Sequence, residues 1–265
     1  MQFIAGKPQK GANHLIKVFV HGNPETSAIW QPLGDELNAR GVADIVLLSP
    51  PGFGTPSPDG WSATQSEYVE WLVSEIERFE SPVDIVGHDW GAGHVYGAIA
   101  RRPDLFRSWA ADCGGLLHRD YVWHDAAQAW QTAGVGEEAI GMFTHMDKAD
   151  LAGVLESLGM TGDIAHEVAT HVNTDMGRCI LHLYRSAAQP AMRDLGAVLA
   201  TKSLPRGAVI IPTADTYPGT PDMAREVARS LKASTIELGD RGHWWMIEDP
   251  ATAAQRLIGF WNTEG

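Results

Sequence analysis

The most constraining feature of the sequence is a short apolar run that ends in a turn flanked by glycines. Residues 83–86 (Val-Asp-Ile-Val) are followed directly by Gly87-His88-Asp89-Trp90-Gly91 and then by small residues. Glycines allow a sharp turn from strand to helix and close packing of that helix, so the central side chain is held at the carboxyl edge of a sheet. The segment predicts a strand–turn–helix unit that presents Asp89, although an ordinary turn with Asp89 as a helix cap has the same pattern.

Five further apolar runs have the length and residue types of buried strands. They cover residues 15–20, 44–49, 107–111, 208–211 and 234–238. Short, nearly continuous apolar strands closed by Gly or Pro are typical of a parallel sheet covered on both faces. Helical patterns separate them over residues 62–79, 221–231 and 252–261, with Ser62 as the expected cap of the first. This alternation predicts a doubly wound α/β core.

The alternation stops between about Leu116 and Leu204. Helical patterns fill this region at residues 121–130, 137–142, 149–158 and 164–185, and no convincing strand is present. We expect an inserted helical lid over residues 116–204, between a first part of the core at 1–115 and a second part at 205–265.

Composition excludes several classes of partner. The formal charge of −13, from 33 acidic and 20 basic residues, argues against nucleic acid and anionic membranes. No apolar run approaches the ~18 residues of a membrane span, and the first twenty residues lack a signal-peptide pattern. Two cysteines, Cys113 and Cys179, are too few for a disulfide framework. We therefore expect a cytoplasmic protein.

Neither a nucleotide cofactor nor a metal ion is expected. Gly52-Phe53-Gly54 lacks the third glycine of a dinucleotide-binding turn. His166 and His171 lie one residue too far apart for the zinc-binding helix motif.

Polar residues follow the other predicted strands at positions that suit nucleophilic catalysis. Asp215 comes after the strand at 208–211, and His243 follows the last strand. A nucleophile, an acid and a histidine in this order form a catalytic triad in which the acid orients the histidine. The first strand ends at His21-Gly22-Asn23-Pro24, where the backbone N–H of Asn23 could join that of Trp90 in an oxyanion hole.

These segments, from His21 to His243, resemble the α/β-hydrolase superfamily, in particular its aspartate-nucleophile branch of epoxide hydrolases and haloalkane dehalogenases. The resemblance implies an alkyl ester on Asp89, hydrolysed by a water that His243 activates, with Asp215 or alternatively Asp112 as the triad acid. A carboxylate is ionised at pH 7 and can displace a leaving group from sp³ carbon without prior proton transfer. Because only about fourteen residues precede the first strong strand, the antiparallel N-terminal strands must shrink to one edge strand or none.

The leaving group separates the two activities that the resemblance implies. An epoxide oxygen needs an acid, and Tyr184 lies in a segment, residues 178–185, that resembles the proton-donating lid segment of epoxide hydrolases. The usual first lid tyrosine is absent near Ala126, and His124 resembles a minority pattern that replaces it. A halide needs only neutral donors, and haloalkane dehalogenases use the residues that match Asn23 and Trp90.

We predict an epoxide hydrolase that forms a diol, with haloalkane hydrolysis to alcohol and halide as the alternative. A third possibility is a member of the superfamily that is not catalytic or acts on esters, and that binds a small hydrophobic ligand without hydrolysing it by the aspartate mechanism. The expected partners are a small, mostly apolar substrate and water, and a second copy of the chain if it forms a homodimer. Four tryptophans are expected to line a pocket beneath the lid, namely Trp90, Trp123, Trp130 and Trp244.

Overall fold

The computed structural model describes residues 2–3 and 15–263 and contains one seven-stranded sheet. The strand order is β1-β3-β2-β4-β5-β6-β7, with β1 antiparallel to β3 and every other pair parallel. The strands are β1 Gln2–Phe3, β2 Lys17–Val20, β3 Ile45–Leu48, β4 Val83–Gly87, β5 Phe106–Ala111, β6 Arg206–Pro212 and β7 Ser234–Leu238. The prediction of a doubly wound, mostly parallel core is confirmed, and β1 is the one antiparallel edge strand among the residues that the structure describes.

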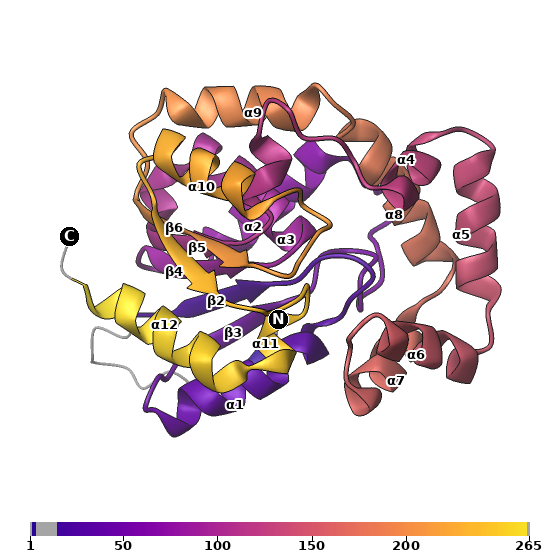
Figure 1. Cartoon of the computed structure of the whole chain (residues 1–265), viewed down its shortest axis with the longest axis horizontal. Helices are drawn as coiled ribbons and strands as arrows, with labels where there is room; N and C mark the ends of the chain where they lie inside the picture. Colours follow the sequence, from indigo (N-terminus) through magenta and orange to yellow (C-terminus); the bar gives the residue numbers. More distant parts are fainter. Residues whose placement is uncertain (1, 4–14, 264–265) are drawn as a thin grey trace.

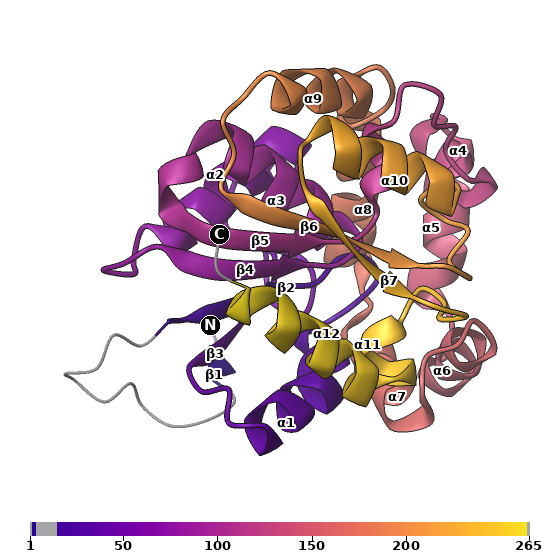
Figure 2. The same cartoon turned by 60° about the vertical axis from the view of Figure 1, so that its left-hand side comes forward.

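Helices cover both faces of the sheet, which explains why its central strands are buried along their whole length. On one face lie α1 (Gln31–Ala39) and α12 (Pro250–Asn262), which pack on each other (Figures 1 and 2). The other face carries α2 (Gln65–Ile76), α3 (Trp90–Arg101), α9 (Ala191–Ala200) and α10 (Pro221–Ser230). Shorter segments complete the core: η1 Ser27–Trp30, η2 Pro103–Leu105, η3 Gly114–Leu117 and α11 Trp245–Glu248.

Helix α2 begins later than its sequence pattern predicts. Its cap is Thr64, whose side chain accepts a hydrogen bond from the backbone N–H of Glu67. The expected cap, Ser62, is wrong because its hydroxyl instead donates to the Glu67 carboxylate at 2.5 Å. A left-handed residue, Ala63 at φ 53°, separates the two positions, so the helix cannot extend back to Ser62.

Five helices lie beyond the carboxyl ends of the strands, at the right of Figure 1. They are α4 Asp125–Gln131, α5 Val135–His145, α6 Lys148–Ser157, α7 Gly162–His171 and α8 Thr174–Ser186. The pattern read as one helix over 164–185 is two helices, because Asn173 caps α8 by accepting from the backbone N–H of Met176. Since α9 packs against α3, we propose that the lid consists of α4 to α8.

Polar contacts anchor the lid to the core. The Thr26 hydroxyl donates to Glu167 of α7 at 2.6 Å. On α8, Asp175 accepts from the Ser57 hydroxyl at 2.8 Å, and Arg178 donates to the backbone oxygen of Trp61 at 2.8 Å. These bonds fix the positions of α7 and α8 over the strand ends. Among residues 2–3 and 15–263, no helix has the length and apolarity needed to cross a bilayer.

Candidate active site

The turn between β4 and α3 holds Asp89 in a strained conformation, with φ 50° and ψ −121°. Close approach of the neighbouring backbone requires glycine on both sides of the turn. A Cβ on Gly87 would lie 2.7 Å from the Cα of Ala92, and one on Gly91 would lie 2.1 Å from the Val20 carbonyl oxygen. Strain of this kind persists only where packing over-determines it, as at a functional side chain.

The backbone N–H of Asn23 donates to Asp89 Oδ2 at 2.8 Å. The backbone nitrogen of Trp90 borders the same space, because a Cβ on Gly22 would lie 2.4 Å from it. Burial raises the pKa of Asp89 to about 6, although the nearby His243 opposes this shift. The predicted oxyanion groups and the predicted nucleophile are therefore neighbours.

His243 follows β7 and bonds to Asp215, which follows β6. The distance from His243 Nδ1 to Asp215 Oδ2 is 2.8 Å. The other oxygen of Asp215 accepts from the backbone N–H of Tyr217 at 3.0 Å, which fixes the carboxylate. Burial alone would lower the pKa of His243, but the charge and hydrogen bond of Asp215 outweigh it, so the pKa is raised. The structure brings the predicted acid and histidine together as the sequence analysis expected.

Asp112 lies in a second network, which the sequence analysis did not foresee. His88 is fully buried between two carboxylates, with Nδ1 2.5 Å from Asp112 Oδ2 and Nε2 3.0 Å from Glu25 Oε1. Both carboxylates raise the pKa of His88 well above its usual value, against the effect of burial. The imidazolium in turn lowers the pKa of Glu25 to about 2, although burial raises it. We call Glu25, His88 and Asp112 the buried network.

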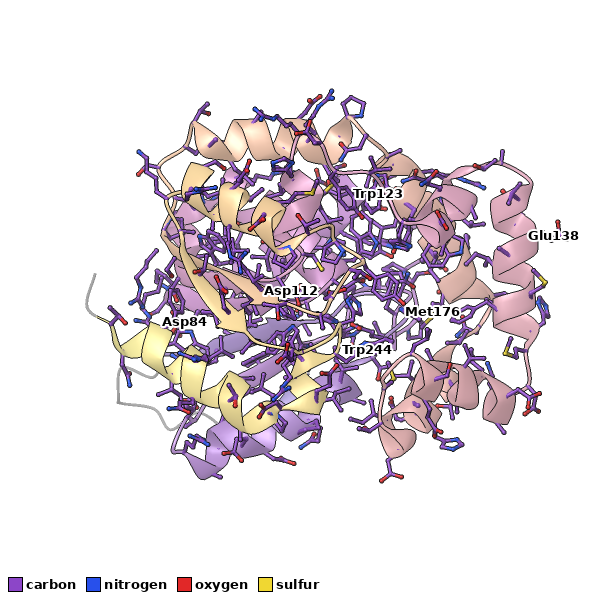
Figure 3. The ribbon with its side chains drawn as sticks, in the orientation of Figure 1. Asp84, Asp112, Trp123, Glu138, Met176 and Trp244 are labelled. Atoms are coloured by element: carbon purple, nitrogen blue, oxygen red, sulfur yellow. The ribbon has the colours of Figure 1, made fainter. Side chains whose placement is uncertain are left out.

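The buried network ties together four loops of the candidate site, those that follow β2, β4, β5 and β7. Glu25 accepts from the backbone N–H of Gly22 at 2.9 Å, and Asp112 accepts from that of Asp89 at 2.9 Å. The indoles of Trp244 and Trp245 donate to Glu25 at 2.6 Å and to Asp112 at 2.7 Å. Figure 3 shows Asp112 near the centre of the molecule and Trp244 between the sheet and the lid. Of the three residues of the buried network, the sequence analysis considered only Asp112 as a candidate triad acid, because it follows a strand. Nothing in the sequence pattern marks Glu25.

Tyr184 projects from α8 toward the nucleophile. Its hydroxyl oxygen accepts from the Asn23 side-chain nitrogen at 3.5 Å, and its ring lies edge-on to the Trp90 indole with centroids 5.1 Å apart. Burial and the charge of Asp89 raise the pKa of this phenol well above its usual value, although the Asn23 and Trp90 side chains oppose the shift. The ring packs against Trp130 at 4.7 Å and Trp123 at 5.6 Å between centroids. The phenol is therefore protonated at neutral pH and firmly placed.

His124 lies at the start of α4 and caps that helix. Its Nδ1 accepts from the backbone N–H of Ala127 at 3.3 Å, so its proton is on Nε2. Burial and the neighbouring His243 lower the pKa of His124. A neutral imidazole of this tautomer can donate a hydrogen bond through Nε2. It gives up that proton far less readily than an imidazolium would.

Two cavities meet at these side chains. The larger, of about 250 Å³, has an almost wholly apolar wall apart from the site residues. It is lined by Asn23, Pro24, Asp89, His124, Ala126, Trp130, Phe143, Val154, Leu155, Leu158, Ile180, Tyr184, Tyr217, His243 and Trp244. The smaller, of about 10 Å³, is lined by Asp89, Trp90, Cys113, Leu116, Tyr121, Trp123, His124, Tyr184, Tyr217 and Pro218. All four tryptophans expected at a pocket line one of these cavities.

Potential metal ligands also gather here, but their chemistry does not suit a resident ion. In the described part of the chain, two groups have ligand atoms within 4.8 Å of one another: Glu25, His88 and His243, and Cys113, Asp215 and His243. Both nitrogens of His88 are bonded to carboxylates, and Nδ1 of His243 is bonded to Asp215. Burial raises the pKa of the Cys113 thiol, which keeps it protonated.

Comparison with known proteins places this geometry in a family. The model of the "Alpha/beta hydrolase family" matches residues 18–256. A haloalkane dehalogenase from Bradyrhizobium diazoefficiens is 26% identical, over 93% of this chain and 86% of that protein. An epoxide hydrolase from Caballeronia sordidicola is 31% identical, but over 38% of this chain and 31% of its own length.

Solved structures agree on the fold. The haloalkane dehalogenase DbeA from Bradyrhizobium elkanii superposes with a TM-score of 0.72 at 23% identity, covering 95% of this chain and 90% of the other. A deformylase from Pseudomonas putida S16 reaches 0.73 at 13% identity, covering 93% and 92%. Structural likeness therefore spans different chemistries, and the site must decide between them.

Proposed function

Because the chain belongs to the alpha/beta hydrolase family, we propose that it hydrolyses epoxides to vicinal diols through a covalent ester on Asp89. The observation that carries this proposal is the place of the Tyr184 hydroxyl. Its oxygen receives a hydrogen bond from the Asn23 amide, so its own proton is free to point elsewhere. Tyr184 and Asp89 line the same cavity, which suits attack on carbon with proton donation to the departing oxygen.

In the first step, a carboxylate oxygen of Asp89 forms a bond to one ring carbon of the epoxide. Oδ2 is held by the Asn23 N–H, so Oδ1 is the attacking atom. The carbon–oxygen bond of the ring breaks, and its electron pair stays on the ring oxygen, which takes the proton of Tyr184. Asn23 and Trp90 stabilise the phenolate that remains. The product is a hydroxyalkyl ester.

In the second step, His243 removes a proton from water, and the resulting hydroxide attacks the ester carbonyl of Asp89. The oxyanion that develops faces the backbone N–H groups of Asn23 and Trp90. Asp215 stabilises the imidazolium that forms. Collapse of the tetrahedral intermediate expels the diol as an alkoxide, which takes the proton of the His243 imidazolium. The carboxylic proton left on Asp89 passes to the Tyr184 phenolate, which restores the starting state.

Haloalkane hydrolysis is the second candidate, and the full-length dehalogenase relatives favour it. A departing halide would need the Asn23 amide and the Trp90 indole as donors. The Asn23 amide instead donates to the phenol oxygen of Tyr184, whose ring packs edge-on against the Trp90 indole, so Tyr184 stands where a halide would have to bind. A dehalogenase would also have no use for a protonated phenol at this position. The epoxide reaction uses all three groups.

A matched pair of substrates tests the proposal. Purified protein is given 1,2-epoxyhexane or 1-bromohexane, and diol and bromide are measured separately. Diol formation without bromide release is the expected result. Bromide release without diol would establish the dehalogenase reading. Turnover of neither, with binding of both, would support a protein that holds small hydrophobic molecules without converting them.

A further inference from the structure

The candidate nucleophile lies where two cavities of very different size meet. Asp89, His124, Tyr184 and Tyr217 line both cavities, and all other wall residues belong to one cavity alone. The larger holds about 250 Å³ and the smaller about 10 Å³. A group bound over Asp89 therefore has generous space on one side and almost none on the other.

The larger cavity suits a single apolar chain or ring. Its wall away from the site residues is formed by side chains such as Trp130, Phe143, Leu155 and Ile180. At its rim, Val154 and Leu158 are exposed. Its volume corresponds to roughly eight water molecules at ~30 Å³ each, so a substituent of several carbons fits.

The smaller cavity admits about one water and cannot expand easily. Its wall residues Cys113, Leu116, Tyr121 and Trp123 are each at most 6% exposed. Trp123 stacks on Trp90 with ring centroids 5.8 Å apart. The Tyr121 hydroxyl donates to the backbone oxygen of Tyr217 at 2.9 Å. Because packed interiors resist added volume, a substituent forced into this space would displace several side chains.

We propose that the protein acts on terminal epoxides, with the unsubstituted methylene toward the smaller cavity and the single substituent in the larger one. This inference rests on the proposed epoxide hydrolysis. Asp89 then forms its ester bond to the methylene carbon, the bond from that carbon to the ring oxygen breaks, and the oxygen on the substituted carbon takes the proton of Tyr184. An internal epoxide would need room for an alkyl group on each side.

Two isomers of one composition test the inference. We expect kcat/KM for 1,2-epoxyoctane to exceed that for trans-4,5-epoxyoctane by about tenfold to a hundredfold, the size of effect that overpacking produces. Over many turnovers in ¹⁸O-labelled water, the label enters the Asp89 carboxylate and passes to the attacked carbon. It should therefore appear on the terminal carbon of the diol, and label on the substituted carbon would overturn the assignment.

Variants of the two cavities sharpen the test. Leu116→Ala enlarges the smaller cavity and should reduce the preference for the terminal isomer several-fold. Trp123→Phe enlarges the same cavity without breaking a hydrogen bond, because the buried Trp123 indole N–H has no partner, and it serves if Leu116→Ala fails to fold. Leu158→Ala enlarges the larger cavity instead and should leave the ratio between isomers unchanged.

The outcomes separate this inference from the proposed function. Equal turnover of both isomers by the unmodified protein overturns the preference for terminal epoxides and leaves epoxide hydrolysis standing. A ratio that moves with Leu158→Ala but not with either small-cavity variant also overturns it. Diol from neither isomer refutes epoxide hydrolysis itself, and the inference with it.

Discussion

Two histidines at the carboxyl edge of the sheet have similar neighbours but differ in their access to the larger cavity. The rings of His88 and His243 lie 4.6 Å apart between centroids, and each bonds to an aspartate through Nδ1. His243 lines the larger cavity. His88 is sealed from solvent, and its second nitrogen is bonded to Glu25.

The comparison shows that an acid–histidine pair is not by itself a catalytic feature. A histidine can act as a base only if one nitrogen reaches the reacting atoms. His88 has no such nitrogen, and its raised pKa keeps it charged as a bridge between two carboxylates. His243 has a single carboxylate and a cavity in front of it. Four experiments test this distinction and the reaction steps that depend on it.

Asp215→Asn is expected to have the largest effect. Without the carboxylate, His243 loses the partner that sets its tautomer and stabilises its imidazolium, and the turnover rate should fall by about 10⁴-fold, as in serine protease triads. Asp112→Asn should affect the chemistry far less, because Asp112 contacts His88 and not His243. Steady-state kinetics with circular dichroism as the folding control checks this. A more severe rate loss in a folded Asp112→Asn protein would reverse the two assignments.

His88→Gln should mainly affect stability. Removing the imidazolium leaves Glu25 and Asp112 buried without a cation between them, which typically costs about 3–5 kcal/mol in the free energy of unfolding. Urea unfolding measures this loss. The matched control is His243→Gln, which leaves Asp215 with its bond from the Tyr217 backbone and should unfold close to the unmodified protein. Similar losses in both variants would contradict the distinction.

Tyr184→Phe should slow the first step by about 10²- to 10⁴-fold, the usual contribution of a general acid. Hydrolysis of an ester already formed on Asp89 should change little, because that step uses His243. Rapid-quench measurements resolve the two steps. Full epoxide activity in both Tyr184→Phe and His124→Ala would remove the main support for the epoxide reaction.

The pH dependence should differ between the two steps. Ester formation needs ionised Asp89, so it should fall tenfold per unit as the pH drops below about 6, the raised pKa of that carboxyl. Ester hydrolysis needs neutral His243, whose pKa is raised above 6.5, so this step should fall at a higher pH. Between the two limits the ester should accumulate in a rapid-quench experiment. If ester formation fell at a higher pH than ester hydrolysis, the result would contradict the two pKa shifts.

Much of the fold could be predicted from the sequence, because strand and helix patterns reflect local burial. The parallel strands begin and end within two residues of their predicted limits, and the turn at Asp89 was marked by its glycines. The start of α2 was missed because two hydroxyl residues, Ser62 and Thr64, compete for the same cap. The break between α7 and α8 was missed because apolar spacing continues across it.

Parts of the site depend on contacts that sequence order does not reveal. The pairing of Asp215 with His243 follows from which strands they terminate, so it could be predicted. Glu25 could not, because its partner His88 is 63 residues away and its role appears only when the loops pack together. The unequal cavities around Asp89 likewise depend on η3 and α8, which meet only in the folded chain.

The most direct test of the central claim is the mass of the species that forms on His243→Gln. Without its base, the protein should stop after the first step and retain the ester on Asp89. An epoxide adds its entire mass, because ring opening expels nothing, whereas a haloalkane adds only its alkyl group. We predict a full-mass adduct with 1,2-epoxyhexane that maps, after digestion, to the peptide containing Asp89. An alkyl adduct from 1-bromohexane alone would establish the dehalogenase reaction. An adduct on another residue, or none with a substrate that the unmodified protein consumes, would contradict the aspartate mechanism itself.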